Sequence, residues 1–220
     1  MAAIRSYLWY VADGEISMQS IALGASKVPF IKGTQKVKET IKPDDLAALL
    51  AAPSDRSKIG IRDKTILILL YDSAIRVSEL RELTLESLKL NETIPYIRVH
   101  GKGDKERRVY FDAKAKVHLK EYIEGRKDEN KALFVTLDAP YDRLKISGVE
   151  IRLRQLGRKL DLEKIHPHKF RRTMATRAID KGMPIEQVQK ILGHSQIDTT
   201  MQYAMVNQNN VKTSHQKYMS

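Results

Sequence analysis

Cysteine is absent from this chain of 220 residues. Disulfide bonds and cysteine-ligated zinc are therefore excluded, and the composition suits a reducing cytoplasm. Long hydrophobic runs are also missing, because the longest candidate, TILILLY (65–71), falls well short of the ~18 apolar residues of a membrane span. The N-terminus lacks the basic region, apolar run and cleavage site of an export signal. We therefore expect a cytoplasmic protein with no membrane partner.

Positive charge is in excess. The chain holds 39 basic and 27 acidic residues, for a net charge of +12 and a pI near 9.7. A nucleic acid is the first partner that this charge suggests, an acidic membrane surface is the second, and a merely solubilising surface is the plain alternative. The phosphate-binding pattern GxxxxGK[ST] is absent, which disfavours nucleotide hydrolysis.

Apolar periodicity and breaking residues predict a mostly α fold with a small antiparallel β-sheet, an α+β class. The sheet is a hairpin over residues 96–111, and ALFVT (132–136) suggests a further short strand. Ser147 and Glu150 have capping-box spacing at the start of a helix. Residues 15–41 have the composition of a linker. Helices are expected within residues 4–14, 42–52, 62–75, 77–83, 113–126, 147–160, 168–182, 184–193 and 198–206.

Two arginines stand where they could bind a phosphate. His168 and Arg171 lie three residues apart in HPHKFRRTMAT (166–176), so a helix places them on one face. Arginine offers a planar fork of donors for two phosphate oxygens, and histidine can move a proton near neutral pH. Arg76 follows a long apolar helix directly. The plain alternatives are a basic face that only touches DNA and, for Arg76, a salt bridge to Glu79 or Glu82.

The hairpin and a C-terminal stretch add further candidates. The turn HGKGDKERRV carries Lys102, Lys105, Arg107 and Arg108, which fit a DNA groove or a leaving group as well as a solvated turn. GHSQIDTTMQY (193–203) contains His194 and Tyr203. Most of the nine tyrosines are expected to be packing residues, so spacing alone does not make Tyr203 a nucleophile.

Taken together, these four stretches resemble the motifs of the tyrosine recombinase (phage integrase) family, in the family's order and over roughly residues 38–206. The most specific match is HPHKFRRTMAT followed by ILGHSQIDTTMQYA (191–204). The resemblance implies the fold of that family's catalytic domain. It also implies six catalytic residues: Arg76, Lys102, His168, Arg171, His194 and Tyr203.

Some positions depart from the family's pattern. Family members often have Thr-Gly-Leu-Arg at the first arginine, where this chain has SAIR (73–76) without the glycine. Arg172 stands where histidine is frequent. The family's separate core-binding domain is not matched, and we expect residues 1–37 to be its last helix plus a linker, in a truncated or unusually short member. Residues 38–206 would be the catalytic domain, and the tail 207–220 would dock on a neighbouring protomer or fray.

The chemistry implied by the resemblance is attack by Tyr203 on a DNA phosphodiester, giving a 3′-phosphotyrosyl link and a free 5′-hydroxyl. The covalent link retains the energy of the phosphodiester, so no ATP is needed, and guanidinium groups can replace a metal ion. We therefore expect no cofactor. His168 would accept the phenolic proton, His194 would donate a further hydrogen bond, and Lys102, with Lys105 as rival, would protonate the leaving oxygen.

Duplex DNA is the expected partner, with a homotetramer on DNA and a monomer in isolation. The residues expected to contact it are Lys105, Arg107, Arg108, Arg152, Arg154 and Arg172. A site-specific recombinase of a mobile element, or of chromosome resolution, is the first functional hypothesis. A type IB topoisomerase-like relaxing enzyme and a non-catalytic DNA-binding protein are the alternatives.

Overall fold

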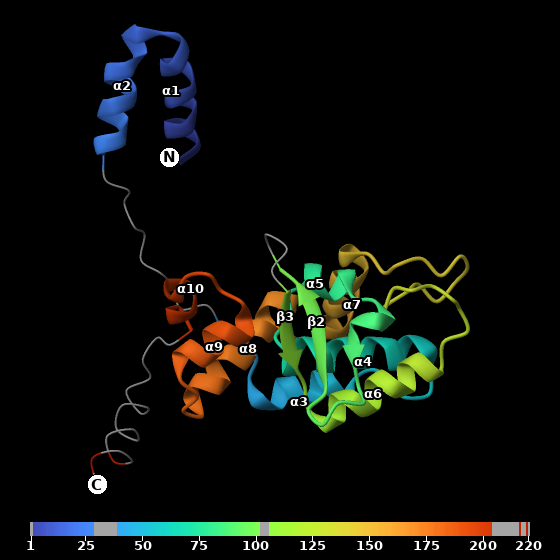
Figure 1. Ribbon diagram of the computed structural model, residues 1–220. Coiled ribbons are helices and arrows are strands. Elements are labelled where there is room, and N and C mark those ends of the chain that lie inside the picture. The colour runs from blue at the N-terminus through green and yellow to red at the C-terminus, as the bar shows by residue number, and fades with distance from the viewer. Residues whose placement is uncertain (1, 29–38, 102–105, 204–215, 217–218, 220) are drawn as a thin grey trace. The chain divides into compact units, whose positions relative to one another are not determined.

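The computed structural model describes residues 2–28, 39–101, 106–203, 216 and 219. The chain divides into two compact units, Met1–Lys38 and Glu39–Ser220. The first unit contains helices α1 (Ala2–Gly14) and α2 (Ile16–Lys27), which run side by side (Figure 1). Among the described residues, no helix is both long and apolar enough to cross a membrane.

The structure has a helix, α2, where the sequence predicted a linker. Residues 16–27 are helical, although Gly24 lies within them. Ala12 of α1 and Ala22 of α2 are the buried residues of this unit, so small side chains let the two helices approach closely. Neither a strong hydrophobic stripe nor a large buried side chain marks α2, and this is why its sequence resembles a linker. Residues 29–38, the rest of the expected linker, lie outside the described residues.

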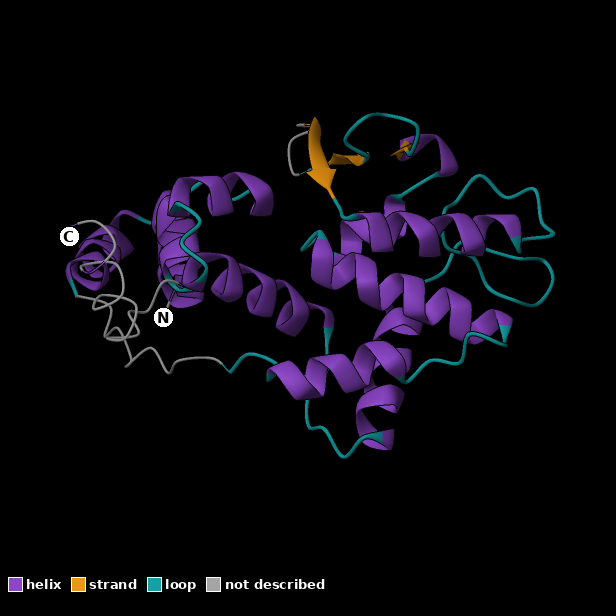
Figure 2. Cartoon of the chain, turned by 90° about the horizontal axis from the view of Figure 1, so that it is seen from below, coloured by secondary structure: helices purple, strands orange, loops and turns teal. Residues whose placement is uncertain are grey.

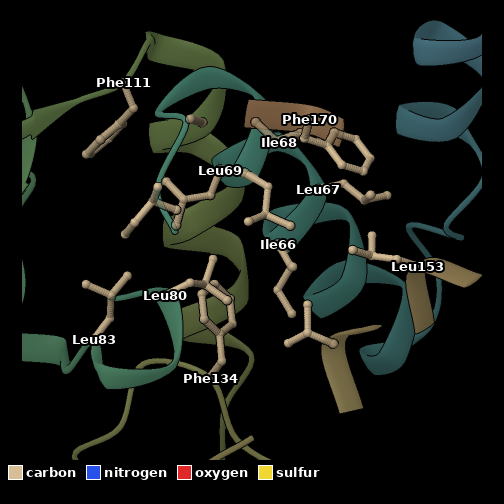
Figure 3. Packing of buried hydrophobic residues seen from close by; sticks show 14 of the residues in the cluster. Ile66, Leu67, Ile68, Leu69, Leu80, Leu83, Phe111, Phe134, Leu153 and Phe170 are labelled. Atoms are coloured by element: carbon tan, nitrogen blue, oxygen red, sulfur yellow. The ribbon is translucent and has the colours of Figure 1, made fainter. Parts of the chain in front are cut away.

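The second unit is built around helix α4 (Lys58–Asp72). Five consecutive residues of α4, from Ile66 to Leu70, are buried, so neighbours surround the helix instead of covering one face. It packs against α3 (Pro43–Ala51), α6 (Ala113–Glu124) and α8 (Pro167–Asp180). Figure 3 shows Ile66, Leu67, Ile68 and Leu69 among side chains from distant segments, including Leu80, Phe134, Leu153 and Phe170.

The sheet is small and antiparallel, in the order β1 (Leu88–Lys89), β2 (Tyr96–His100), β3 (Glu106–Tyr110). Ile97, Val99 and Val109 are buried on it, and Arg107 pairs with Val99 across the hairpin. Figure 2 shows these strands beside an otherwise helical chain. The expected fold class, mostly α with a small antiparallel sheet, is confirmed.

Two local expectations were wrong. Helix α7 (Ile146–Lys159) begins two residues earlier than the capping box requires, with Lys145 as its N-cap and no side-chain cap bond. Ser147 is therefore already inside the helix. The ALFVT segment forms only isolated bridges, Thr84 to Ala132 and Val135 to Arg143, and no strand.

A second, smaller hydrophobic cluster holds the C-terminal helices to the turn after α4. It contains Ala74, Ala175 of α8, and Val188 and Leu192 of α9 (Ile185–Leu192). Tyr203, which follows α10 (Ile197–Met201), packs against its edge. This cluster brings the motifs near residues 76, 171, 194 and 203 to one end of the unit.

Candidate active site

Arg76 is held at the start of helix α5 (Val77–Glu82) by a carboxylate and a carbonyl. Its Nη1 donates to Glu79 Oε1 at 2.9 Å, and its Nη2 donates to the carbonyl of Gly193 at 3.1 Å. Glu79 also accepts from the backbone N–H of Arg76 at 2.9 Å, which satisfies a free donor at the helix start. The expected alternative, a salt bridge to Glu79, is thus present, and it leaves Nη2 directed toward Gly193.

The turn before Arg76 keeps a glycine-like conformation without glycine. Ala74 has φ 49°, in the left-handed region that favours glycine, and is fully buried. This conformation costs an alanine about 1–2 kcal/mol. The carbonyl of Ala74 accepts a hydrogen bond from Arg171 Nη1, so the strained turn also binds the second arginine.

Arg171 projects from α8 into the same region and is 3% exposed. Its Nη2 donates to the carbonyl of Leu192 and lies 3.1 Å from His194 Nε2. Burial, and next the positive charge of Arg76, lower the pKa of Arg171 to about 10, so that the guanidinium remains charged at neutral pH.

Both arginines therefore bind carbonyls at the end of α9, those of its last residue, Leu192, and of its C-cap, Gly193. The carbonyls at the end of a helix lack partners within it and carry partial negative charge, which favours cations there. Gly193 ends α9 in the left-handed conformation, with φ 61°. One helix end thus places two guanidinium groups from distant parts of the chain side by side.

His194 is neutral and fixed in one tautomer. Because a guanidinium only donates, Nε2 of His194 accepts from Arg171, and the ring proton is on Nδ1, 2.9 Å from Thr200 Oγ1. Burial, followed by the charges of Arg171, Arg76 and Arg107, lowers the pKa of His194 to about 4. The sequence-based prediction that His194 donates a hydrogen bond to phosphate does not fit this arrangement, in which its Nε2 is an acceptor.

Tyr203 lies beside this histidine on the same chain. The two rings are stacked with centroids 6.2 Å apart and an angle of 25° between their planes. Tyr203 is half-buried, packed on the small cluster but not enclosed in the main core. Its negative charge, when ionised, would act to raise the pKa of Arg171, so the phenol and that guanidinium interact electrostatically.

His168 completes the cluster from one turn before Arg171 on α8. A small hollow is lined by His168, Arg76 and Arg171 together with Ile75, Val77 and Pro167. His168 itself is exposed. The structure therefore brings five of the six predicted catalytic residues to one region, while the sixth, Lys102, lies outside the described residues.

Glu79 and Arg107 bind each other in this site, a pair that the sequence did not reveal. The guanidinium of Arg107 binds both oxygens of Glu79, at 2.6 and 2.8 Å. Burial alone would raise the pKa of Glu79, but the hydrogen bonds from Arg107 and from the Arg76 backbone outweigh it, and the pKa is lowered. Arg107 thus has a partner inside the protein, which revises its predicted role as a DNA contact.

The other predicted DNA contacts differ in their surroundings. Arg152 is paired with buried Asp63 at 2.6 Å, and Arg172 donates to the carbonyl of Glu39 at 3.0 Å, so both are engaged within the protein. Arg108 is exposed and lies over the Tyr96 ring at 4.9 Å. Arg154 is exposed, and its hydrogen bond among the described residues is to the carbonyl of Glu150 on its own helix. Lys105 lies outside the described residues.

Metal-binding side chains do not gather at this site. Across the part of the chain that the structure describes, no group of three or more His, Asp or Glu residues is arranged to hold a metal ion. The charges that face the hollow come from guanidinium groups.

Comparison with known proteins places this site in a family. The sequence pattern of the phage integrase family matches residues 39–210. Tyrosine recombinase XerC of Thermodesulfovibrio yellowstonii is 35% identical over 215 residues, covering 94% of this chain and 69% of that protein. Tyrosine recombinase XerD of Staphylococcus aureus (strain Mu50) is 35% identical over 196 residues, covering 85% of this chain and 64% of that one.

Solved structures of recombinases have a similar fold. The crystal structure of XerA recombinase has a TM-score of 0.71 at 27% identity and covers all of this chain and 83% of that one. XerH site-specific recombinase bound to its difH substrate has a TM-score of 0.68 and covers 85% of this chain and 56% of that one, and at 21% identity it supports the fold alone.

Together the fold and these similarities define the class of protein, whose curated relatives are named tyrosine recombinases. This chain belongs to the phage integrase family, as its sequence resemblance indicated. It spans between 63% and 69% of the length of curated relatives named XerC and XerD.

Proposed function

We propose that this chain catalyses site-specific recombination of duplex DNA with Tyr203 as the nucleophile. One observation carries the proposal: Nη2 of Arg76 and Nη2 of Arg171 bind adjacent carbonyls, next to the paired rings of His194 and Tyr203. Relatives named tyrosine recombinase support the same activity.

The proposed reaction exchanges one phosphate ester for another. The phenolic oxygen of Tyr203 attacks the scissile phosphorus, and the bond from phosphorus to the 5′-oxygen breaks. The products are a 3′-phosphotyrosyl link and a free 5′-hydroxyl. A 5′-hydroxyl from a partner strand then attacks the link and releases Tyr203, so that no external energy source is required.

Arg76 and Arg171 would bind the non-bridging oxygens, whose negative charge grows in the transition state. Their guanidinium groups are already fixed by protein carbonyls and Glu79, so little reorganisation is needed when the phosphate enters. Loss of one such donor typically lowers the rate at least ~100-fold.

Two proton transfers accompany the exchange. His168, exposed at the hollow beside both arginines, is assigned as the acceptor of the phenolic proton. Lys102 is assigned as the donor to the departing 5′-oxygen, with Lys105 as its rival, since both belong to the hairpin turn. His194 is assigned a positioning role, because its two nitrogens are used by Arg171 and Thr200.

Duplex DNA is the proposed partner, and its phosphates suit a net charge of +12. Four copies acting on two DNA sites, and a single copy in the absence of DNA, remain our proposal for assembly, with the tail 207–220 as a contact between copies. That tail lies almost wholly outside the described residues. The cytoplasm is the proposed location.

Covalent trapping tests the nucleophile. The substrate is a pool of nicked duplexes of randomised sequence, in which the short fragment carrying the freed 5′-hydroxyl diffuses away and prevents religation. The parent and a Tyr141→Phe control, changed at a tyrosine outside the site, should form a protein–DNA adduct that survives denaturation, and Tyr203→Phe should form none. An adduct formed by Tyr203→Phe at the parent rate would show that another residue attacks.

A topoisomerase-like enzyme would use the same arginines and tyrosine without exchanging partners. A plasmid that carries two copies of one DNA site, selected from the randomised pool with the parent protein, distinguishes the two activities. Crossover products support recombination. Relaxation of supercoils without any crossover product favours the relaxing enzyme.

A further inference from the structure

Both oxygens of the Glu79 carboxylate are fully used. Oε1 accepts from Nη1 of Arg76 at 2.9 Å and from Nη1 of Arg107 at 2.6 Å. Oε2 accepts from the backbone N–H of Arg76 at 2.9 Å and from Nη2 of Arg107 at 2.8 Å. A carboxylate offers about four acceptor positions, so none is left for a second side-chain nitrogen of Arg76.

This saturation decides how Arg76 is oriented. A guanidinium and a carboxylate that meet without competitors favour a bidentate pair, with two parallel hydrogen bonds. Here Arg76 reaches Glu79 through Nη1 alone, and its Nη2 donates to the Gly193 carbonyl instead. Without Arg107, two positions on Glu79 would open, and Arg76 would be free to turn both nitrogens onto the carboxylate.

The charge of Arg107 also favours the binding of a phosphate by Arg76. Two guanidinium groups around one buried carboxylate leave this group of three side chains net positive, whereas Arg76 and Glu79 alone would be neutral. Glu79 is 7% exposed, so solvent screens its charge weakly. Arg107 therefore offsets the carboxylate charge that would otherwise reduce the attraction of Arg76 for a phosphate.

Arg107 is itself closely confined. It faces Val99 across the β2–β3 hairpin, and its side chain is 16% exposed. Its Nε is buried and has no hydrogen-bond partner among the described residues, and it lies against Gly193, where an added Cβ would approach it to 2.9 Å. A buried donor without a partner is destabilising, so stability alone does not explain an arginine here.

We propose that Arg107 is a positioning residue for the recombination reaction: by filling two acceptor positions on Glu79, it keeps Nη2 of Arg76 available to the scissile phosphate. This inference rests on the proposed function. It assigns Arg107 a positioning role without giving it a contact to DNA.

A double-mutant cycle tests the proposal, using the full chain and a nicked duplex selected from the randomised pool with the parent protein. Adduct formation is followed in a single turnover for the parent, Arg107→Gln, Glu79→Gln and the double variant. Arg107→Gln should be slower by about 10- to 100-fold, because Arg76 is misplaced. The double variant should be faster than Arg107→Gln, because the carboxylate that captures Arg76 has been removed.

The controls separate this role from a purely structural one. Arg126→Gln breaks a bidentate pair with Asp128 at a distance from the site, so it should lower the melting temperature and leave the rate of adduct formation unchanged. Arg107→Lys provides a second variant if Arg107→Gln folds poorly. Lysine keeps the positive charge but fills fewer acceptor positions on Glu79, so the rate of adduct formation should lie between those of the parent and Arg107→Gln.

The outcomes are distinct. Adduct formation by Arg107→Gln at the parent rate overturns the inference alone, as does a double variant no faster than Arg107→Gln. If the parent forms no adduct, or if Tyr203→Phe forms one as the parent does, the proposed function fails and this inference fails with it. Recovery in the double variant, combined with loss in Tyr203→Phe, supports both.

Discussion

At the scale of single residues, the protonation state of His194 links the arginines to the tyrosine. Its Nε2 accepts from Arg171, its Nδ1–H points to Thr200, and its ring stacks on Tyr203. A protonated His194 would present a donor to a donor and would place a third positive charge near Arg171 and Arg76. The arrangement in the structure therefore depends on a neutral imidazole.

This dependence predicts how stability changes with pH. The pKa of His194 is about 4 in the folded protein and 6.5 as the ordinary value, so the unfolded chain binds a proton that the folded chain does not between those values. The free energy of unfolding should therefore fall as the pH is lowered from about 6.5 to about 4. Denaturant unfolding across this window measures it. His194→Gln should show a weaker dependence, and an identical dependence in parent and variant would contradict the assignment.

Gly193 has two reasons to be glycine. Its φ is 61°, and an added Cβ would lie 2.9 Å from Nε of Arg107. We predict that Gly193→Ala lowers stability by about 1–2 kcal/mol through backbone strain and also slows adduct formation by displacing Arg107. Gly182→Ala is the matched control, since Gly182 has φ 89° with open space around it. It should lose stability but keep the parent's rate per folded molecule.

The sequence offered the motifs of the candidate site and Glu79 as a partner of Arg76, but it did not reveal the other partners. The motifs around Arg76, Arg171 and Tyr203 carry local chemistry in a recognisable order. The pairing of Arg107 with Glu79 joins a strand to a helix 28 positions earlier, and that of Arg152 with Asp63 spans 89 positions. Such pairs depend on tertiary packing, which spacing along the chain does not encode, so both arginines looked like free DNA contacts.

At the scale of elements, the end of α9 organises the site. Its terminal carbonyls bind two arginines, its left-handed glycine turns the chain, and the next helix returns Tyr203 beside His194. Long helices were predictable, whether from a continuous apolar run, as in α4, or from apolar periodicity, as in α7. The two-residue strand β1 and the small-residue helix α2 were not, since neither shows the periodicity that marks a longer element.

Helix α10 holds His194 in place through Thr200, which is fully buried. Thr200→Val would leave Nδ1–H of His194 without an acceptor, and a buried unsatisfied donor costs about 1–3 kcal/mol. We predict a lower melting temperature together with slower adduct formation, because the ring can then rotate away from Arg171. Thr65→Val serves as control, since it removes hydroxyl bonds to the carbonyls of Ile61 and His118 in the main core. That control should lose stability alone, and equal rates in both variants would contradict a role for Thr200.

At the scale of the whole molecule, the net charge of +12 predicts DNA binding that weakens steeply with salt. Not every arginine should contribute. Arg152 already neutralises buried Asp63 and also binds Gln155. Arg154 on the same helix is exposed, and within the described part of the chain it binds a carbonyl of its own helix. Of these two neighbours, only Arg154 has its charge free to meet a phosphate.

The two variants Arg154→Gln and Arg152→Gln therefore separate surface charge from internal structure. The dissociation constant for a fixed duplex is measured over a range of salt concentrations. Arg154→Gln should reduce the slope of log K against log salt by about 1, the value for one lost phosphate contact. Arg152→Gln should keep the parent slope but lower stability by about 1–3 kcal/mol, because Asp63 loses a partner in the protein interior. The reverse pattern would mean that helix α7 presents Arg152 to DNA, which would require the Asp63 pair to open on binding.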